Sequence, residues 1–199
     1  WIQTLYAGAK CNIINNGHIS ETVFLKRGVR QGCPLSPLLY VLVIESLANA
    51  IRKDERIHGV PIPGTSATHK ISAYADDATL CLLGDRSIVR SFDIITMYER
   101  ASGGKLNMEK TEGIHVGTNA QRQTGPVPIR WRTDAIIVLG TRIGNDEQQD
   151  WEKPIEKLRK KCEAWRKRSL SMLGKALLIR TYGIAALTYL ASLFPVPPP

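Results

Sequence analysis

Two adjacent aspartates, Asp76 and Asp77, are the residues of this sequence best suited to chemistry. The apolar runs on either side, residues 71–75 and 78–83, alternate as two short β-strands would, which predicts the pair at the bend of a hairpin. Mg²⁺ takes one or two carboxylates together with waters and substrate phosphates, and such a bend offers those ligands. The pattern predicts a phosphoryl-transfer site that uses Mg²⁺, or Mn²⁺ in its place. An ordinary turn is the alternative.

A second stretch that could bind anions runs from Arg30 through Gln31 and Gly32 to residue 37. Ser36 is predicted to cap a helix, with Pro37 at the first helical position. A loop that ends on a helix N-terminus presents free amides to anionic groups. A plain junction between loop and helix is the alternative.

Helices on both sides of the hairpin must position these residues. Residues 38–51 are apolar nearly all round in their first half, which predicts a helix buried under a sheet. A second helix follows the hairpin and is predicted to end at the glycine pair 103–104. This alternation predicts an α+β fold, an antiparallel sheet with helices on one face. The carboxylates are expected on the free face.

The segment after the second helix contains one more candidate for chemistry. Lys110 precedes a short strand, residues 113–116, and could stabilise charge or donate a proton to a leaving pyrophosphate. A solvated lysine is the alternative. Residues 118–128 are predicted to be a linker, and residues 127–131 and 136–139 to pair as a hairpin.

From residue 150 onward the sequence predicts a basic helix. An apolar stripe recurs at helical spacing and consists of Trp151, Ile155, Leu158, Cys162 and Trp165. Ten basic and four acidic residues between 150 and 180 give this stretch a net charge of +6. A phosphate backbone is the predicted partner of the basic face, and simple solvation is the alternative. The lysines expected to contact nucleic acid are Lys157, Lys160, Lys161 and Lys167.

Composition supports a polyanionic partner. The 199 residues contain 27 Lys or Arg against 18 Asp or Glu, for a net charge of +9. The four cysteines are far apart and suggest neither a zinc site nor a disulfide framework. Residues 170–194 are strongly apolar, but Lys175 and Arg180 interrupt them, so a buried helix is predicted and no membrane partner. No targeting segment is visible, and an intracellular location, nuclear or cytoplasmic, is expected.

Three motifs, in this order and spacing, resemble the reverse transcriptase of non-LTR (LINE-type) retrotransposons. They are R-Q-G-C-P-L-S-P at residues 30–37, Y-A-D-D at 74–77 and G-K-L-N-M-E-K-T at 104–111. The resemblance extends to W-I-Q-T-L-Y-A-G at 1–8, to V-L-G-T-R-I-G at 138–144 and to residues 165–175. It implies an RNA-directed DNA polymerase that uses an RNA template, a DNA primer and deoxynucleoside triphosphates.

The resemblance also implies roles for individual residues. Asp76 and Asp77 would be metal ligands, and Lys110 would lie by the triphosphate. Arg30, Gln31 and Gly32 would lie near the incoming nucleotide and template, Tyr74 and Ala75 near the primer terminus, and Leu139 and Gly140 in the primer grip. The implied organisation is a partial polymerase palm at 1–118, a linker and primer-grip-like hairpin at 119–145, a helical thumb at 146–194 and a proline-rich, disordered tail at 195–199.

One departure from the family pattern affects activity. A two-metal site needs a carboxylate from a second strand. The acids before Tyr74 are Glu21, Glu45, Asp54 and Glu55, and none ends an apolar strand. The sequence is therefore expected to be the C-terminal part of a palm with its thumb, completed by an upstream fingers and palm segment of the same polyprotein and inactive without it. The alternative is a catalytically silent remnant that only binds nucleic acid.

Overall fold

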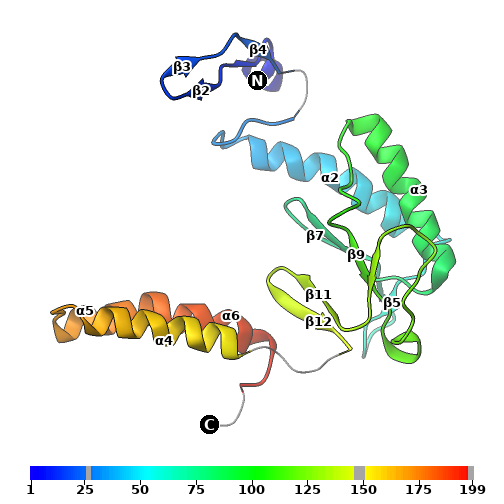
Figure 1. Cartoon of the computed structure of the whole chain (residues 1–199). Helices are drawn as coiled ribbons and strands as arrows, with labels where there is room; N and C mark the ends of the chain where they lie inside the picture. Colours follow the sequence, from blue (N-terminus) through cyan, green and yellow to red (C-terminus); the bar gives the residue numbers. More distant parts are fainter. Residues whose placement is uncertain (26–27, 146–150, 197–199) are drawn as a thin grey trace. The chain divides into compact units, whose positions relative to one another are not determined.

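The computed structural model describes residues 1–25, 28–145 and 151–196, and it contains two compact units, Trp1–Asn107 and Met108–Pro199 (Figure 1). The domain boundary predicted at residue 118 lies inside the second unit. The helices are α1 (Ile2–Tyr6), α2 (Ser36–Lys53), α3 (Gly84–Ser102), η1 (Gly117–Asn119), α4 (Glu152–Arg166), α5 (Met172–Leu178), the π-helical η2 (Ile179–Ile184) and α6 (Ala185–Leu193). The strands are β1 (Lys10–Cys11), β2 (Ile14–Asn15), β3 (His18–Ile19), β4 (Val23–Phe24), β5 (Val60–Pro61), β6 (Thr68–His69), β7 (Ile71–Tyr74), β8 (Asp77–Leu80), β9 (Glu112–Ile114), β10 (Arg130–Arg132), β11 (Ala135–Val138) and β12 (Thr141–Gly144).

The core of the first unit lies where α2, α3 and the start of β7 meet. Its buried members are Leu47, Ala48, Ile51, Ile57, Ile71 and Ile94. On α2 the buried positions are three and four residues apart, so the second half of this helix presents one apolar stripe to the core. Figure 1 shows α2 and α3 packed beside each other, with β7 close to α2. The predicted combination of helices and antiparallel strands is confirmed.

The first half of α2 differs from the prediction of a buried helix. Leu38 and Leu42 are 63% and 70% exposed, and Val41 and Val43 are exposed as well. An all-round apolar sequence predicts burial, but burial requires neighbouring elements on every side of the helix. Within the described residues, the apolar core of the first unit covers one side of the second half of α2 and leaves these four side chains exposed.

The strands form separate two-stranded ladders in the described part of the chain, so the predicted sheet is more fragmented than expected. β7 and β8 pair antiparallel in the register Ile71 with Leu80 and Tyr74 with Asp77. An isolated antiparallel bridge joins Leu82, which follows β8, to Gly59, which precedes β5. The remaining antiparallel pairs of this unit are β1 with β4, β2 with β3 and β5 with β6.

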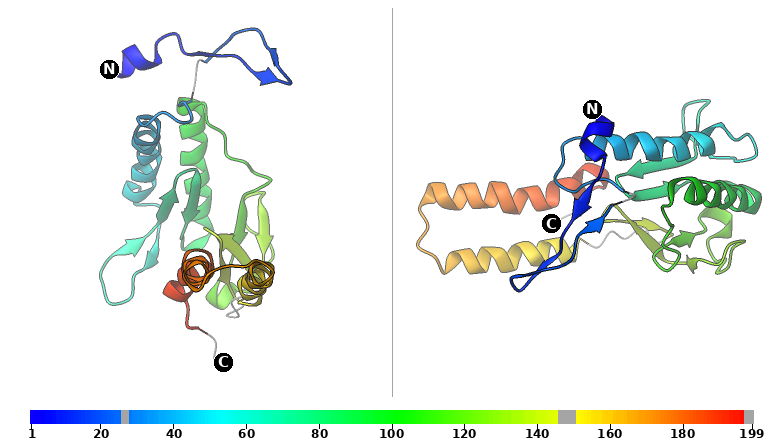
Figure 2. Two further views of the ribbon diagram at one scale, coloured as in Figure 1. Left: turned by 90° about the vertical axis from the view of Figure 1, so that its left-hand side faces the viewer. Right: turned by 90° about the horizontal axis from the view of Figure 1, so that it is seen from above.

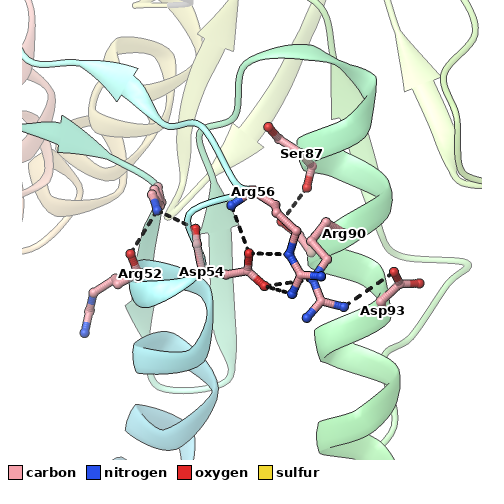
Figure 3. A network of polar contacts seen from close by, with 8 residues as sticks. Arg52, Asp54, Arg56, Ser87, Arg90 and Asp93 are labelled. Carbon is pink, nitrogen blue, oxygen red and sulfur yellow. Dashed lines mark hydrogen bonds and ion pairs between the residues drawn. The ribbon is translucent and has the colours of Figure 1, made fainter.

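A polar network centred on Asp54 ties the base of this hairpin to both helices (Figure 3). The Asp54 carboxylate accepts hydrogen bonds from Arg56 at 2.7 Å and from Arg90 of α3 at 2.8 Å. Lys70, just before β7, donates to the carbonyls of Arg52 and Asp54 at 2.9 Å. Hydrogen bonds from Arg56, and then from Arg90, hold the pKa of the Asp54 carboxyl well below its usual range. Only 9% of the Asp54 side chain is exposed, although Asp54 lies directly after the end of α2.

In the second unit, the predicted pairing of residues 127–131 with 136–139 is wrong. β10 pairs in parallel with β9, and the hairpin forms between β11 and β12. Leu139 and Gly140 have φ of 50° and 79°, which suits a two-residue hairpin turn directly after β11. That turn fixes the partner of β11 as the strand that follows it in sequence.

The predicted linker folds around Trp131. His115 stacks on the indole with ring centroids 4.5 Å apart, and Trp131 Nε1 donates to the carbonyl of Val127. A Cβ at Gly125 would lie 2.0 Å from the indole, so only glycine fits this close approach. Asn145 donates to the carbonyls of His115, Ala120 and Thr133. The linker is therefore part of a packed structure.

Helices α4 and α6 run alongside each other (Figure 2). Helix α6 is preceded by α5 and η2, and α4 to α6 together form a helical arm. The Ser171 side chain caps α5 by accepting from the Gly174 amide at 3.1 Å. Most of α5, η2 and α6 is exposed, including Leu173 and Leu177, so the prediction of a buried helix is wrong. Within the described residues, no single helix is both long enough and apolar enough to span a membrane. The segments Met172–Ile184 and Leu187–Leu193, which are bent by 44° relative to each other, meet the length and composition of a span only when taken as a pair. Residues 146–150 of the predicted thumb and 197–199 of the predicted tail lie outside the described residues.

Candidate active site and nucleic-acid interface

The Tyr74–Asp77 sequence forms the tip of the β7–β8 hairpin, as predicted. Ala75 and Asp76 make the two-residue turn, and Tyr74 and Asp77 are the last pair of the ladder. All four residues are exposed. Ala75 has φ of 51°, a conformation that costs an L-residue about 1 kcal/mol and for which glycine is the usual choice. The turn therefore presents both carboxylates to solvent on a strained backbone.

Tyr40 of α2 belongs to the surroundings of this turn, although the sequence analysis did not select it. Burial raises the pKa of the Tyr40 phenol, and the charges of Tyr98 and Asp76 raise it further. An effect of the Asp76 charge on Tyr40 places the two side chains within electrostatic reach of each other. In the sequence, Tyr40 is a single tyrosine among the apolar residues of α2. That pattern does not indicate that its side chain lies near Asp76.

The donor set at the turn fits a divalent cation in part. Two adjacent, exposed carboxylates provide the oxygen ligands that Mg²⁺ or Mn²⁺ prefers. Within the described residues, no three or more His, Cys, Asp or Glu side chains gather to hold a metal ion. The turn can therefore supply part of a two-metal site, which needs further ligands.

The loop that contains Arg30, Gln31 and Gly32 is organised by Tyr6 of α1. The Arg30 guanidinium lies over the Tyr6 ring, 5.6 Å from its centroid, and the Tyr6 and Ser36 hydroxyls are 2.8 Å apart. Ser36 is the first residue of α2, so the prediction that it caps the helix is wrong. Its hydroxyl is buried against Tyr6 instead. Gln31 and Gly32 are exposed, and Gly32 has φ of 79°.

Electrostatic effects in this loop converge on Cys33. The Leu35 backbone and then the Ser36 hydroxyl lower the pKa of the Cys33 thiol. These groups stabilise negative charge at the start of α2. Anion binding by this loop stays a prediction. Tyr6 is a second functional candidate that the sequence analysis missed.

The predicted basic face lies on α4. Lys157 is three and four residues before Lys160 and Lys161, which places these three lysines toward one side of α4, and Lys167 is the C-cap residue that follows the helix. Lys160 approaches Glu156 at 3.8 Å, and Lys161 lies over the Tyr182 ring, 5.8 Å from its centroid. Trp165 also contacts Tyr182, whereas Cys162, predicted in the apolar stripe, is exposed.

The predicted site residues divide between the two units. Tyr74, Ala75, Asp76 and Asp77 meet in one turn of the first unit, which also contains residues 30–32. The second unit contains Lys110, the Leu139–Gly140 turn and the lysines of α4. Lys110 is exposed in a turn just before β9.

Comparison with known families decides the assignment. Residues 1–175 match the family model described as reverse transcriptase (RNA-dependent DNA polymerase). The chain belongs to the reverse transcriptase family. The match includes the Tyr74–Asp77 turn, the loop at residues 30–37, the β11–β12 hairpin and all of α4.

Relatives of this reverse transcriptase chain come from transposable elements. It is 31% identical over 186 residues to the transposon TX1 uncharacterized 149 kDa protein of Xenopus laevis, covering 90% of the chain and 14% of that protein. It is 34% identical over 128 residues to a retrovirus-related Pol polyprotein from type-1 retrotransposable element R2 of Popillia japonica, covering 61% of the chain and 20% of that protein. A Pol polyprotein from type-2 retrotransposable element R2DM of Drosophila melanogaster is 29% identical over 116 residues, covering 57% of the chain and 10% of that protein. The predicted kinship with reverse transcriptases of non-LTR, LINE-type retrotransposons is confirmed, and the chain spans a fifth or less of each of these relatives.

Proposed function

We propose that this chain is part of an RNA-directed DNA polymerase that extends a DNA primer on an RNA template. It would supply the catalytic turn (residues 74–77), the loop that contacts the nucleotide (residues 30–32) and a helix that binds nucleic acid (α4). The observation that carries the proposal is the exposed Asp76–Asp77 pair at a hairpin tip, within a reverse transcriptase family match. The first unit and β9 would form part of the palm, the β11–β12 hairpin the primer grip, and α4 to α6 the thumb.

In this proposal Asp76 is the more direct metal ligand and Asp77 the second. These two carboxylates would hold divalent ions, which would supply charge stabilisation for phosphoryl transfer. Arg30, Gln31 and Gly32 would contact the incoming deoxynucleoside triphosphate and template, and Lys110 the triphosphate. Tyr74 and Ala75 lie next to the carboxylates and would contact the primer terminus.

In this proposal the metal site is completed by a further carboxylate, which the family resemblance places upstream of residue 1. In the described residues the Asp76–Asp77 pair belongs to no larger acidic group that could hold a metal. Two like charges at an exposed tip bind Mg²⁺ weakly unless further ligands enclose the ion. We therefore assign the missing ligand to an upstream fingers and palm segment of the same polyprotein.

Primer extension tests this function. Deoxynucleotide incorporation on an RNA template with Mg²⁺ is compared for residues 1–199 alone, for the chain joined to its upstream polyprotein segment, and for that longer chain carrying Asp76→Asn. We expect activity only from the unaltered longer chain, because the asparagine amide keeps the shape but loses the charge that holds the ions. Synthesis by residues 1–199 alone would contradict the proposal that a further carboxylate is required. Full activity of Asp76→Asn would show that residues 74–77 form only a turn and have no catalytic role. A longer chain that binds duplex but never extends a primer would be the catalytically silent remnant.

Nucleic-acid binding by the basic face can be tested separately. Binding should depend steeply on salt, with a slope of about −0.9 per phosphate contact on B-DNA. Replacing Lys157, Lys160, Lys161 and Lys167 by alanine should flatten the slope by up to about 3.6, since up to four contacts are removed. A filter-binding titration against log salt measures this, and an unchanged slope would remove α4 from the interface.

A further inference from the structure

A tyrosine of the last helix holds the β11–β12 hairpin at its turn. The Tyr189 hydroxyl of α6 donates to the carbonyl of Leu139 at 3.0 Å. The same oxygen accepts a hydrogen bond from the Thr141 hydroxyl at 3.3 Å. One side-chain oxygen therefore bonds to both sides of the Leu139–Gly140 turn, although Tyr189 is 50 residues away from Leu139 in sequence.

The conformation of the turn shows why such a contact matters. Leu139 has φ of 50°, a region that a branched side chain rarely adopts, and strained residues of this kind persist when their surroundings enforce them. Thr141 is 4% exposed, so its hydroxyl needs a partner inside the protein. Tyr189 satisfies that hydroxyl and fixes the Leu139 carbonyl in one arrangement. It lies beyond residue 175, where the match to the family model ends.

We propose that Tyr189 is a positioning residue that locks the primer-grip turn and thereby sets where the primer 3′ end lies. This inference rests on the proposed function, which assigns the Leu139–Gly140 turn to the primer grip. The two hydrogen bonds of Tyr189, here called the lock, are a property of the second unit alone. Tyr189 acts through the backbone of Leu139 and Gly140, so it needs no contact with nucleic acid. The helical arm and the hairpin are thereby coupled, and displacement of α6 would release the turn.

Two readouts on the 199-residue chain test this inference. The first is hydrogen–deuterium exchange of the backbone amides around residues 139–141, which reports the lock directly. The second is the fluorescence of a 2-aminopurine at the primer 3′ end, annealed to an RNA template and bound to the chain, which reports the primer terminus. Total duplex affinity and its salt slope are measured in parallel, because they depend on α4.

The variants separate the lock from general stability. Tyr189→Phe keeps the ring and removes both hydrogen bonds, and Thr141→Val removes one of them while keeping the shape. Thr141→Ser restores the hydroxyl. Tyr182→Phe is the matched control, since the contacts of Tyr182 with Lys161 and Trp165 are made by its ring.

We expect Thr141→Val to accelerate exchange at the turn by about two- to tenfold, the range for one lost hydrogen bond, and Tyr189→Phe, which loses both bonds, to accelerate it at least as much. Both should shift the 2-aminopurine signal with duplex affinity and salt slope unchanged, and Thr141→Ser and Tyr182→Phe should behave like the unaltered chain. Unchanged exchange in Tyr189→Phe would overturn the lock. Faster exchange with an unchanged 2-aminopurine signal would reduce Tyr189 to a structural role. If the unaltered chain bound no duplex, the proposed function and the positioning role would both fail, and the exchange data would still decide whether the lock exists.

Discussion

The β7–β8 and β11–β12 hairpins have similar backbones but are held in different ways. Each has a two-residue turn whose first residue, Ala75 or Leu139, has a positive φ without being glycine. Each is fixed at its base, β7 by the buried Ile71 and β11 by the buried Ala135. Both turns are exposed, but they differ in their partners, because Tyr189 bonds to the Leu139 carbonyl, whereas no side chain from elsewhere in the described residues hydrogen-bonds to residues 74–77.

This difference fits the two proposed roles. A turn that must take up metal ions and a primer terminus has to leave its side chains accessible. A turn that only supports the primer has to keep its backbone in one place, and a tyrosine from a distant helix provides that restraint. Strain is common to both turns, but among the described residues a side chain from outside the hairpin hydrogen-bonds only to the Leu139–Gly140 turn.

The largest expected effect is on primer extension, which should depend strongly on the β7–β8 turn and weakly on the β11–β12 turn. In the chain joined to its upstream segment, Asp77→Asn should lower primer extension by at least about a hundredfold, because it removes charge next to the transferring phosphate. Thr141→Val should lower extension less than about tenfold, since it affects only the position of the turn. Extension rates at saturating nucleotide measure both. Equal losses would contradict the distinction between a catalytic and a positioning turn.

The base of the β7–β8 hairpin can be loosened at Asp54. The pKa of this carboxyl is depressed in the folded state, so its contribution to stability is present above the unfolded pKa of about 3.9 and is lost as the pH falls toward the folded value. Asp54→Asn should therefore lower Tm at pH 7, and the difference from the unaltered chain should shrink below about pH 4. Thermal unfolding followed by circular dichroism measures this.

Asp93→Asn is the matched control for Asp54. Its carboxylate is 3.7 Å from Arg90 and its side chain is 59% exposed, so its removal should have little effect. A Tm difference for Asp54→Asn that stayed constant from pH 7 to pH 3 would show that the network does not depend on the charge of Asp54.

The smallest effect concerns strain in the catalytic turn. Ala75→Gly should stabilise the chain by about 0.5 kcal/mol, because glycine adopts a positive φ freely and this gain exceeds the added freedom of the unfolded chain. Chemical denaturation measures the change. A loss of stability would mean that Ala75 does not adopt a positive φ in solution.

The sequence could predict local features. Alternating apolar residues around Asp76 and Asp77 placed the pair at a hairpin tip, and Gly103 ended α3 with φ of 72°. The basic helix and the motif order were equally visible, since each depends on residues close together in the chain. These features follow from side-chain periodicity and backbone preference, which neighbouring residues set by themselves.

Only the tertiary structure decided which distant groups meet. The parallel pairing of β9 with β10, the burial of Asp54 between two arginines and the contact of Ser36 with Tyr6 each depend on residues separated in sequence. Tyr189 shows this most clearly, because nothing near it in the sequence indicates a bond to Leu139. The physical reason is that hydrogen bonds and burial depend on position in space, and a composition or period carries no record of which elements will pack together.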